Sequence, residues 1–211
     1  MNMQRLFAGA ASCLLLAACS SVAPDKPARA QMYDFGPLAT AVAAAAAPSQ
    51  PALVLAELDA VSPLETPALL YRLGYADAHQ LHPYAQARWS APPARLVQQR
   101  LRERLARDRP VLDLAESASL ARTGGASPRV LRVELEEFSH IFDAPAQSFG
   151  IVRMRATLME NSAAGERLVA QRTFVQRQPA PTADAPGGVR ALTAATDAIA
   201  QDIAAWVAAQ R

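Results

Sequence analysis

The residues best suited to bind a metal ion are His79 and His82, with Asp77 close by. Imidazole nitrogens and carboxylate oxygens are ordinary zinc ligands, but a zinc site takes three or four of them. A third and a fourth ligand are not evident, and the segment shows no clear helical pattern. The sequence therefore predicts no metal site.

General acid or base chemistry would fall to Glu134, Glu136 and Glu137, or to His140. Glu134 and Glu136 alternate with apolar residues, a pattern that turns both carboxylates toward solvent on a β-strand. His140 stands alone in the sequence. The chain also has no glycine-rich phosphate loop of the required spacing and no Gly-x-Ser-x-Gly nucleophile turn. We therefore predict that the protein is not an enzyme. An enzyme with a dispersed active site is the less favoured alternative.

The two cysteines, Cys13 and Cys19, indicate a modification rather than a disulfide. Residues 6–18 are apolar or small and follow a short start with one positive charge, which is typical of a secretory signal peptide. This run is shorter than the roughly 20 residues of a membrane-spanning helix. It ends in Leu-Ala-Ala-Cys, which resembles the bacterial lipobox, where the Cys thiol receives a diacylglyceryl group. We expect this lipid on Cys19; an ordinary signal peptide with a chance cysteine is the alternative.

These features divide the chain into a lipoprotein signal peptide at 1–18, a lipidated flexible tether at 19–30 and one domain at 31–211. Several acyl chains, palmitate among them, would hold the mature protein on a membrane. Ser20 stands where the inner-membrane retention signal would place Asp. By analogy with that sorting rule, we expect an anchor in the outer membrane, on its periplasmic face.

The charge balance excludes an electrostatic nucleic-acid binder. The 211 residues include 21 basic and 19 acidic side chains, a formal net charge of +2. The length suffices for one ordinary domain and a tether. We predict no cofactor other than the covalent lipid on Cys19.

The first half of the domain predicts short strands and one amphipathic helix. In residues 92–108, Val97, Leu101 and Leu105 recur every four positions, which predicts a helix with one apolar stripe and an arginine-rich outer face. Ser90 is its expected N-cap. A near-pure alanine tract lies between the first and the second expected strand and suggests no function. The expected strands, bounded by Pro or Gly, are 32–35, 53–58 and 69–75, and the alanine tract is 41–47.

The second half predicts an antiparallel three-stranded meander. After a short strand at 111–114 and a turn at 123–125, apolar residues alternate with charged ones over 131–136 and 152–158. Strict alternation gives each strand one buried and one solvated face, and opposite charges on the solvated faces favour their pairing. A turn then leads to a third strand at 168–175.

The last predicted element is a helix over 189–209, after a loop rich in Pro and Gly at 179–188. Its apolar residues recur every three or four positions in one stripe, so we expect it to pack on the sheet. The fold class expected from these elements is α/β: a single domain with a mixed sheet, a C-terminal antiparallel meander and helices packed on its faces.

The segment 83–93, Pro-Tyr-Ala-Gln-Ala-Arg-Trp-Ser-Ala-Pro-Pro, is predicted to be irregular and to lead into the helix. Two interpretations stay open for its aromatic residues. They fill the core at the start of the helix, or they present an anchor for a partner, because Tyr, Trp and Arg are enriched at interface hot spots. The first is favoured, since a Trp in a compact domain is mostly buried. The candidate partner-binding residues are Tyr84, Arg88, Trp89, Pro92 and Pro93.

The ordered motifs resemble the ABC-type transport auxiliary lipoproteins, the PqiC-like family. They are the lipobox at Cys19, Tyr-Asp-Phe-Gly-Pro at 33–37, Leu-Leu-Tyr-Arg-Leu-Gly-Tyr at 69–75, the segment from Tyr84 to Pro93 with its helix, and Gly-Gly-Val-Arg-Ala-Leu at 187–192. One departure is Ser-Pro-Leu at 62–64, where many members would carry an aromatic residue. The resemblance implies a fold similar to the amino-terminal domain of TolB-like proteins.

The resemblance also implies a role. Such proteins look like the outer-membrane-side, non-enzymatic accessory or docking subunits of MCE-type systems that move phospholipid across the periplasm. The implied partners are a periplasmic MCE-domain protein and its inner-membrane permease and ATPase, and self-association into a homo-oligomer stays open. The alternative function is an envelope-assembly lipoprotein or an activator of a peptidoglycan synthase.

Overall fold

One mixed sheet organises the part of the chain that the computed structural model describes, residues 29–37, 50–122, 127–162 and 165–210. The expected α/β fold class is confirmed: one domain combines a mixed sheet with helices. The strands in these ranges are β1 (Gln31–Tyr33), β2 (Leu53–Leu55), β3 (Asp59–Ala60), β4 (Ala68–Leu73), β5 (Asp77–Trp89), β6 (Val111–Leu112), β7 (Arg129–Ala144), β8 (Gln147–Ser162) and β9 (Gly165–Pro179). The helices are the 3-10 helix η2 (Ser62–Leu64) and the α-helices α2 (Pro93–Ala106), α3 (Leu114–Arg122) and α4 (Ala185–Ala209).

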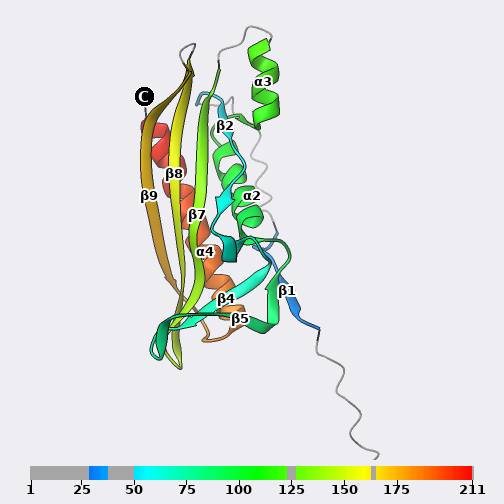
Figure 1. Ribbon diagram of the computed structural model, residues 1–211, viewed down its shortest axis with the longest axis vertical. Coiled ribbons are helices and arrows are strands. Elements are labelled where there is room, and N and C mark those ends of the chain that lie inside the picture. The colour runs from blue at the N-terminus through cyan, green and yellow to red at the C-terminus, as the bar shows by residue number, and fades with distance from the viewer. Residues whose placement is uncertain (1–28, 38–49, 123–126, 163–164, 211) are drawn as a thin grey trace, which may run out of the picture.

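Three long antiparallel strands, β7, β8 and β9, form the predicted meander (Figure 1). Alternation along β7 and β8 turns one set of apolar side chains into the core and confirms the predicted buried face. These core residues are Leu131, Val133 and Leu135 on β7, and Val152, Met154, Ala156 and Leu158 on β8. All three strands extend well beyond the predicted segments.

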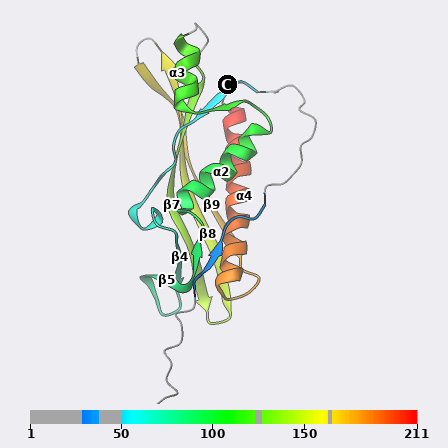
Figure 2. The ribbon, with the colours of Figure 1, turned by 90° about the vertical axis from the view of Figure 1, so that its right-hand side faces the viewer.

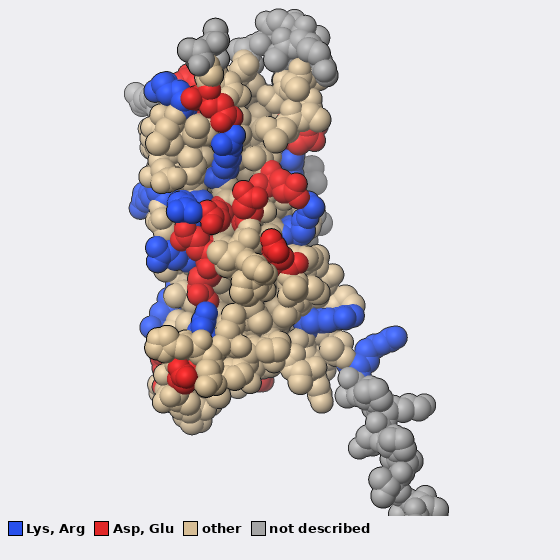
Figure 3. Space-filling model, viewed as in Figure 1, with Lys and Arg blue, Asp and Glu red and all other residues tan. Residues whose placement is uncertain are grey.

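The outer face of the meander carries paired charges, as the sequence predicted. Glu134 and Arg155 are register partners and form an ion pair. Glu136 lies 2.7 Å from Nε of Arg153. Figure 3 shows intermixed acidic and basic residues on this side of the molecule. Cross-strand pairs of opposite charge contribute modestly to pairing and fix its register.

The opposite edge of β7 is covered in succession by three short parallel strands. β2 pairs with residues 129–131, β3 with 134–135 and β4 with 140–142. β5 continues the sheet antiparallel to β4, and β1 lies parallel to the end of β5. The short strands therefore line one edge of the long central strand, with β2 near its upper end and β4 and β5 near its lower end (Figure 1).

The helices α2 and α4 lie on the same side of the sheet (Figure 2). On α2, Val97, Leu101 and Leu105 are buried, which confirms the predicted stripe. On α4 the predicted stripe faces the meander, where Trp206 packs edge-on against Phe174 of β9 with ring centroids 5.8 Å apart. The sheet thus has one covered face and one open, charged face.

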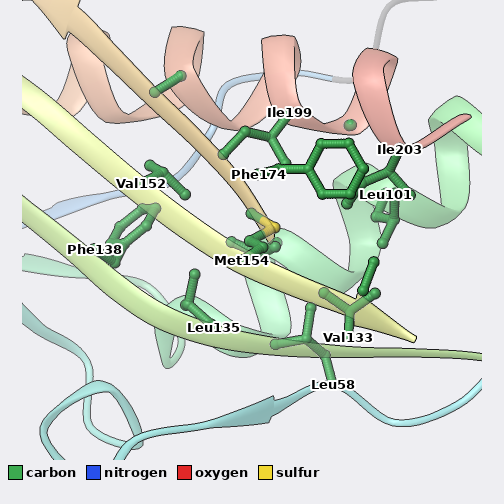
Figure 4. Close-up of a cluster of buried hydrophobic side chains, with 14 of the residues drawn as sticks. Leu58, Leu101, Val133, Leu135, Phe138, Val152, Met154, Phe174, Ile199 and Ile203 are labelled. Carbon is green, nitrogen blue, oxygen red and sulfur yellow. The ribbon is translucent and has the colours of Figure 1, made fainter. Parts of the chain in front are cut away.

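The main hydrophobic core fills the space between the sheet and these two helices (Figure 4). Phe138 and Met154 from the sheet meet Ile199 and Ile203 from α4 and Leu101 from α2. Each fully buried aliphatic or aromatic side chain contributes about 1.5–3 kcal/mol to folding. This core holds every element that carries a candidate site residue.

Four local predictions are wrong. Residues 83–89 are not irregular but belong to β5, and Pro92 rather than Ser90 occupies the N-cap of α2. The short helix α3 was not predicted. The last helix begins at Ala185, four residues earlier than predicted, because the Asp184 carboxylate accepts a hydrogen bond from the Gly187 amide at 2.8 Å and Pro186 is tolerated in a first turn. The alanine tract 41–47, the turn at 123–125 and Cys19 lie outside the described residues.

Candidate interaction site

The candidate residues on β5 are separated by the strand's alternation. Ala87 and Trp89 are buried, whereas Arg88 between them is exposed. In a strand, neighbouring side chains point to opposite faces. Arg88 and Trp89 therefore cannot belong to one contiguous surface patch.

Trp89 lies in the core. Its exposed fraction is 1%, and its ring packs against Phe35 and Phe138, each with a centroid distance of 5.5 Å. Pro93 is buried as well, and Pro92 is half-buried at the N-cap of α2. This geometry matches the core interpretation for Trp89 and Pro93.

Arg88 lies beside Met32, its register partner on β1, and both side chains are exposed. Met32 is exposed to 59%, and the Arg88 guanidinium makes no hydrogen bond or ion pair with any other described residue. Among the described strands, β1 is the last of its edge, so its outer backbone groups have no strand partner. We refer to Met32, Arg88 and the exposed edge of β1 as the edge patch.

Tyr84 joins a buried group that the sequence did not reveal. Its hydroxyl lies 2.8 Å from Nδ1 of His140 on β7, which is 0% exposed. Tyr71 packs against the Tyr84 ring at 4.6 Å, and Phe142 packs against His140 at 4.5 Å. These aromatic rings fasten the β4–β5 hairpin to β7 and to the start of α4.

Burial controls the ionisation of this pair. It lowers the pKa of His140 to about 4, against a smaller opposing effect of Asp184. Burial also raises the pKa of the Tyr84 hydroxyl, helped by Tyr71 and Asp184. The first turn of α4 packs directly on the imidazole, since a Cβ at Gly188 would lie 2.5 Å from Nδ1 of His140. His140 is therefore a neutral core residue at physiological pH.

A bulge places His140 in the core. The register of β7 shifts between Leu135 and Glu137, so the buried face moves from odd-numbered to even-numbered positions. Phe138, His140 and Phe142 are buried as a result. The alternation of these three residues was the signal that could have identified His140.

The other candidate chemical groups are not brought together. The pairing of β4 with β5 is irregular between Asp77 and His82, and the two histidines, His79 and His82, have different surroundings. The His79 ring is exposed beside Asp77, and the His82 ring stacks on Tyr71 at 5.3 Å. Within the described ranges no three His, Cys, Asp or Glu residues are grouped as metal ligands. The carboxylates of Glu134 and Glu136 are engaged by arginines.

Comparison with known proteins identifies relatives. The model of the family described as "ABC-type transport auxiliary lipoprotein component" matches residues 33–204. No curated protein matches the sequence. Among the described helices, none has the length and apolar character to span a bilayer.

Two solved structures share the fold at low sequence identity. Protein XCC0632 from Xanthomonas campestris, of family model DUF330, superposes with a TM-score of 0.63 at 18% identity, covering 76% of this chain and 86% of its own. An uncharacterized protein superposes with a TM-score of 0.59 at 14% identity, covering 85% of this chain and 99% of its own. Similarity at this level concerns the fold alone.

Proposed function

This chain belongs to the family of ABC-type transport auxiliary lipoprotein components, and we propose that it is a lipid-anchored, non-enzymatic docking subunit of an ABC transport system. The observation that carries the proposal is the family match, which spans residues 33–204 and so covers nearly all of the described domain. The arrangement of the site agrees with it: the polar groups of the core serve packing, and the carboxylates of the open face are neutralised by arginines.

The proposed partner is a periplasmic MCE-domain protein, linked to an inner-membrane permease and ATPase, and the proposed cargo is phospholipid. The edge patch is the proposed contact surface. Support comes from the exposed Met32 beside the unpaired Arg88 guanidinium and from the free outer edge of β1. Arginine and methionine are both enriched in protein interfaces, and an open strand edge offers backbone donors and acceptors to a partner.

The proposed anchor is a lipid on Cys19 in the outer membrane. A thioether-linked diacylglyceryl group with a further acyl chain would bind the bilayer more firmly than one chain alone. β1, the first described strand, lies toward the β4–β5 end of the molecule (Figure 1), so a tether that precedes it would leave the domain near this end. In this arrangement the edge patch also lies on the tethered side.

Co-purification tests the proposal. Full-length protein with a carboxyl-terminal tag is isolated from detergent-solubilised envelopes, and bound proteins are quantified by mass spectrometry. We expect an MCE-domain protein and its ATPase to be enriched. Enrichment of a peptidoglycan synthase in their place would support the alternative function and overturn the transport assignment.

The variant Cys19→Ala tests the anchor separately. It should accumulate as unprocessed or mislocalised precursor and take up no labelled fatty acid. Lipid labelling equal to that of the wild type would contradict the anchor without affecting the docking proposal.

A further inference from the structure

A pocket of about 640 Å³ lies at the end of the molecule opposite the β4–β5 hairpin, where the carboxyl end of α4 meets β2 and the ends of the meander (Figure 1). Its walls combine apolar side chains with two arginines. Pro51, Ala52, Pro128 and Ala208 supply accessible apolar surface, and Arg109 and Arg129 supply positive charge. This volume is typical of sites for small organic ligands.

Arg109 is the unusual residue of the pocket. Its exposed fraction is 7%, yet it makes no hydrogen bond or ion pair with any residue in the described ranges. Burial lowers the pKa of its guanidinium, and Asp108 only partly opposes this effect. The Asp108 carboxylate is itself held by Arg104 at 2.9 Å. No Arg109 nitrogen is among the described side-chain atoms that are buried without a hydrogen-bond partner, so its guanidinium reaches the pocket, where an anion would stabilise it.

Among the described residues that line the pocket, the other charged groups do not compensate this positive charge. Arg129 uses one N–H to donate to the Gln210 carbonyl at 2.7 Å, and a guanidinium carries five such donors. Glu160 also lines the pocket, but its carboxylate is ion-paired with Arg167. Two guanidinium groups therefore face a cavity whose acidic residue is already engaged.

We propose that this pocket binds the oxyanion group, phosphate or carboxylate, of a small amphiphile. Arg109 binds the oxyanion, because guanidinium N–H groups match its geometry in pairs. Arg129 contributes further donors. The apolar body of the ligand packs on Pro51, Ala52, Pro128 and Ala208. This inference is independent of the docking function, since it concerns the opposite end of the molecule from the edge patch.

Calorimetric titration of the full-length protein in non-ionic detergent tests the inference. The probes are dihexanoylphosphatidate, its uncharged counterpart dihexanoylglycerol, and inorganic phosphate. We expect saturable binding of the phosphatidate and at least about tenfold weaker binding of the uncharged probe. Equal binding of inorganic phosphate that depends on Arg109 would support the oxyanion site and identify a free anion as its ligand.

Two variants distinguish binding in the pocket from a general effect of the protein's positive charge. Arg109→Gln should weaken phosphatidate binding by about tenfold or more, the usual loss when an oxyanion loses an arginine. Arg107→Gln is the matched control, because it removes the same charge from an exposed position two residues away. Equal weakening by both variants, or binding that is unchanged in Arg109→Gln, would overturn the proposal.

Folding of the variant is checked independently. Because Arg109→Gln removes a guanidinium that forms no ion pair with a described residue, the ligand-free variant should unfold at a temperature no lower than the wild type. If Arg109→Gln fails to fold, Arg129→Gln is used in its place. It should also weaken phosphatidate binding, and Arg107→Gln remains the control. Unchanged phosphatidate affinity in a folded Arg129→Gln protein would then contradict the two-arginine site.

Discussion

The hydroxyl of Tyr84 lies 2.8 Å from Nδ1 of His140, across 56 positions of sequence. This contact joins the β4–β5 hairpin to the central strand β7 at the point where α4 begins. The Nε2 atom of the same imidazole is buried without a partner among the described residues, so the bond to Tyr84 is the polar contact that the ring makes there. This buried hydrogen bond therefore adds to the β4–β7 strand pairing and the aromatic contacts that hold the hairpin in place.

Tyr84→Phe should lower the free energy of unfolding by about 1–3 kcal/mol, because it leaves a second buried ring nitrogen without a partner. Urea denaturation followed by circular dichroism measures the change. Tyr75→Phe is the matched control, since Tyr75 is exposed at the tip of the same hairpin. An equally small effect of the two substitutions would contradict a structural role of the Tyr84–His140 bond.

Stability should fall as the pH drops from about 6.5 toward about 4, because the unfolded chain protonates this histidine first while the folded protein keeps His140 neutral. A difference of this size between the folded and unfolded pKa corresponds to about 3 kcal/mol. Asp197 acts in the opposite direction, since burial raises its pKa and the folded state takes up that proton first. The contribution of His140 is therefore measured against a variant.

The test compares the free energy of unfolding at neutral and mildly acidic pH in the wild type, in His140→Leu and in His79→Ala. His140→Leu should lose much of the pH dependence, and His79→Ala, which removes an exposed histidine, should keep it. The same pH dependence in all three proteins would show that His140 titrates normally.

Substitutions at Trp89 and at Arg88 should have different effects: the first should lower stability, and the second should weaken binding of the partner. Trp89→Ala should destabilise the protein by about 3–5 kcal/mol, as expected for a buried aromatic residue. Arg88→Ala should change the free energy of unfolding by less than about 0.5 kcal/mol, as expected for a surface residue, and should weaken co-purification of the partner. Thermal unfolding and quantitative co-purification measure the two effects. Full partner recovery with Arg88→Ala would remove Arg88 from the interface.

Gly150→Ala should destabilise the contact between β8 and α4 by about 1–3 kcal/mol, the usual cost of overpacking. An added Cβ would lie 2.7 Å from the Leu192 backbone nitrogen, so the helix would have to move. Gly74→Ala is the comparison with a milder expected clash, because its Cβ would lie 3.1 Å from the Phe142 carbonyl oxygen. Urea denaturation should rank Gly150→Ala as the more damaging change, and the reverse order would contradict the close packing of α4.

The meander and the two amphipathic helices could be predicted because their patterns are local. Alternation over 131–136 and 152–158 identified both the buried face and the paired charges, and the spacing of Val97, Leu101 and Leu105 identified the stripe of α2. Such a pattern depends only on which side of the helix or strand faces the core, so it can be recognised within one segment of sequence.

β5 and the His140 pair could not be predicted from local pattern. Pro83 argued against a strand, but β1 covers only residues 87–89, so Pro83 faces no strand on that side within the described residues. The bulge in β7 then shifts the alternation before His140, which makes a core histidine look isolated in the sequence. In both cases the deciding contact comes from a distant segment.

Site-specific photo-crosslinking shows whether the protein docks onto a transport partner through the edge patch. A photoreactive residue in place of Arg88 is compared with one in place of Leu114, which is exposed on α3 at the other end of the molecule. The account predicts that position 88 crosslinks to an MCE-domain protein in intact envelopes and that position 114 does so far less. Crosslinks from position 88 to a peptidoglycan synthase, or equal crosslinking of the MCE-domain protein from both positions, would contradict it.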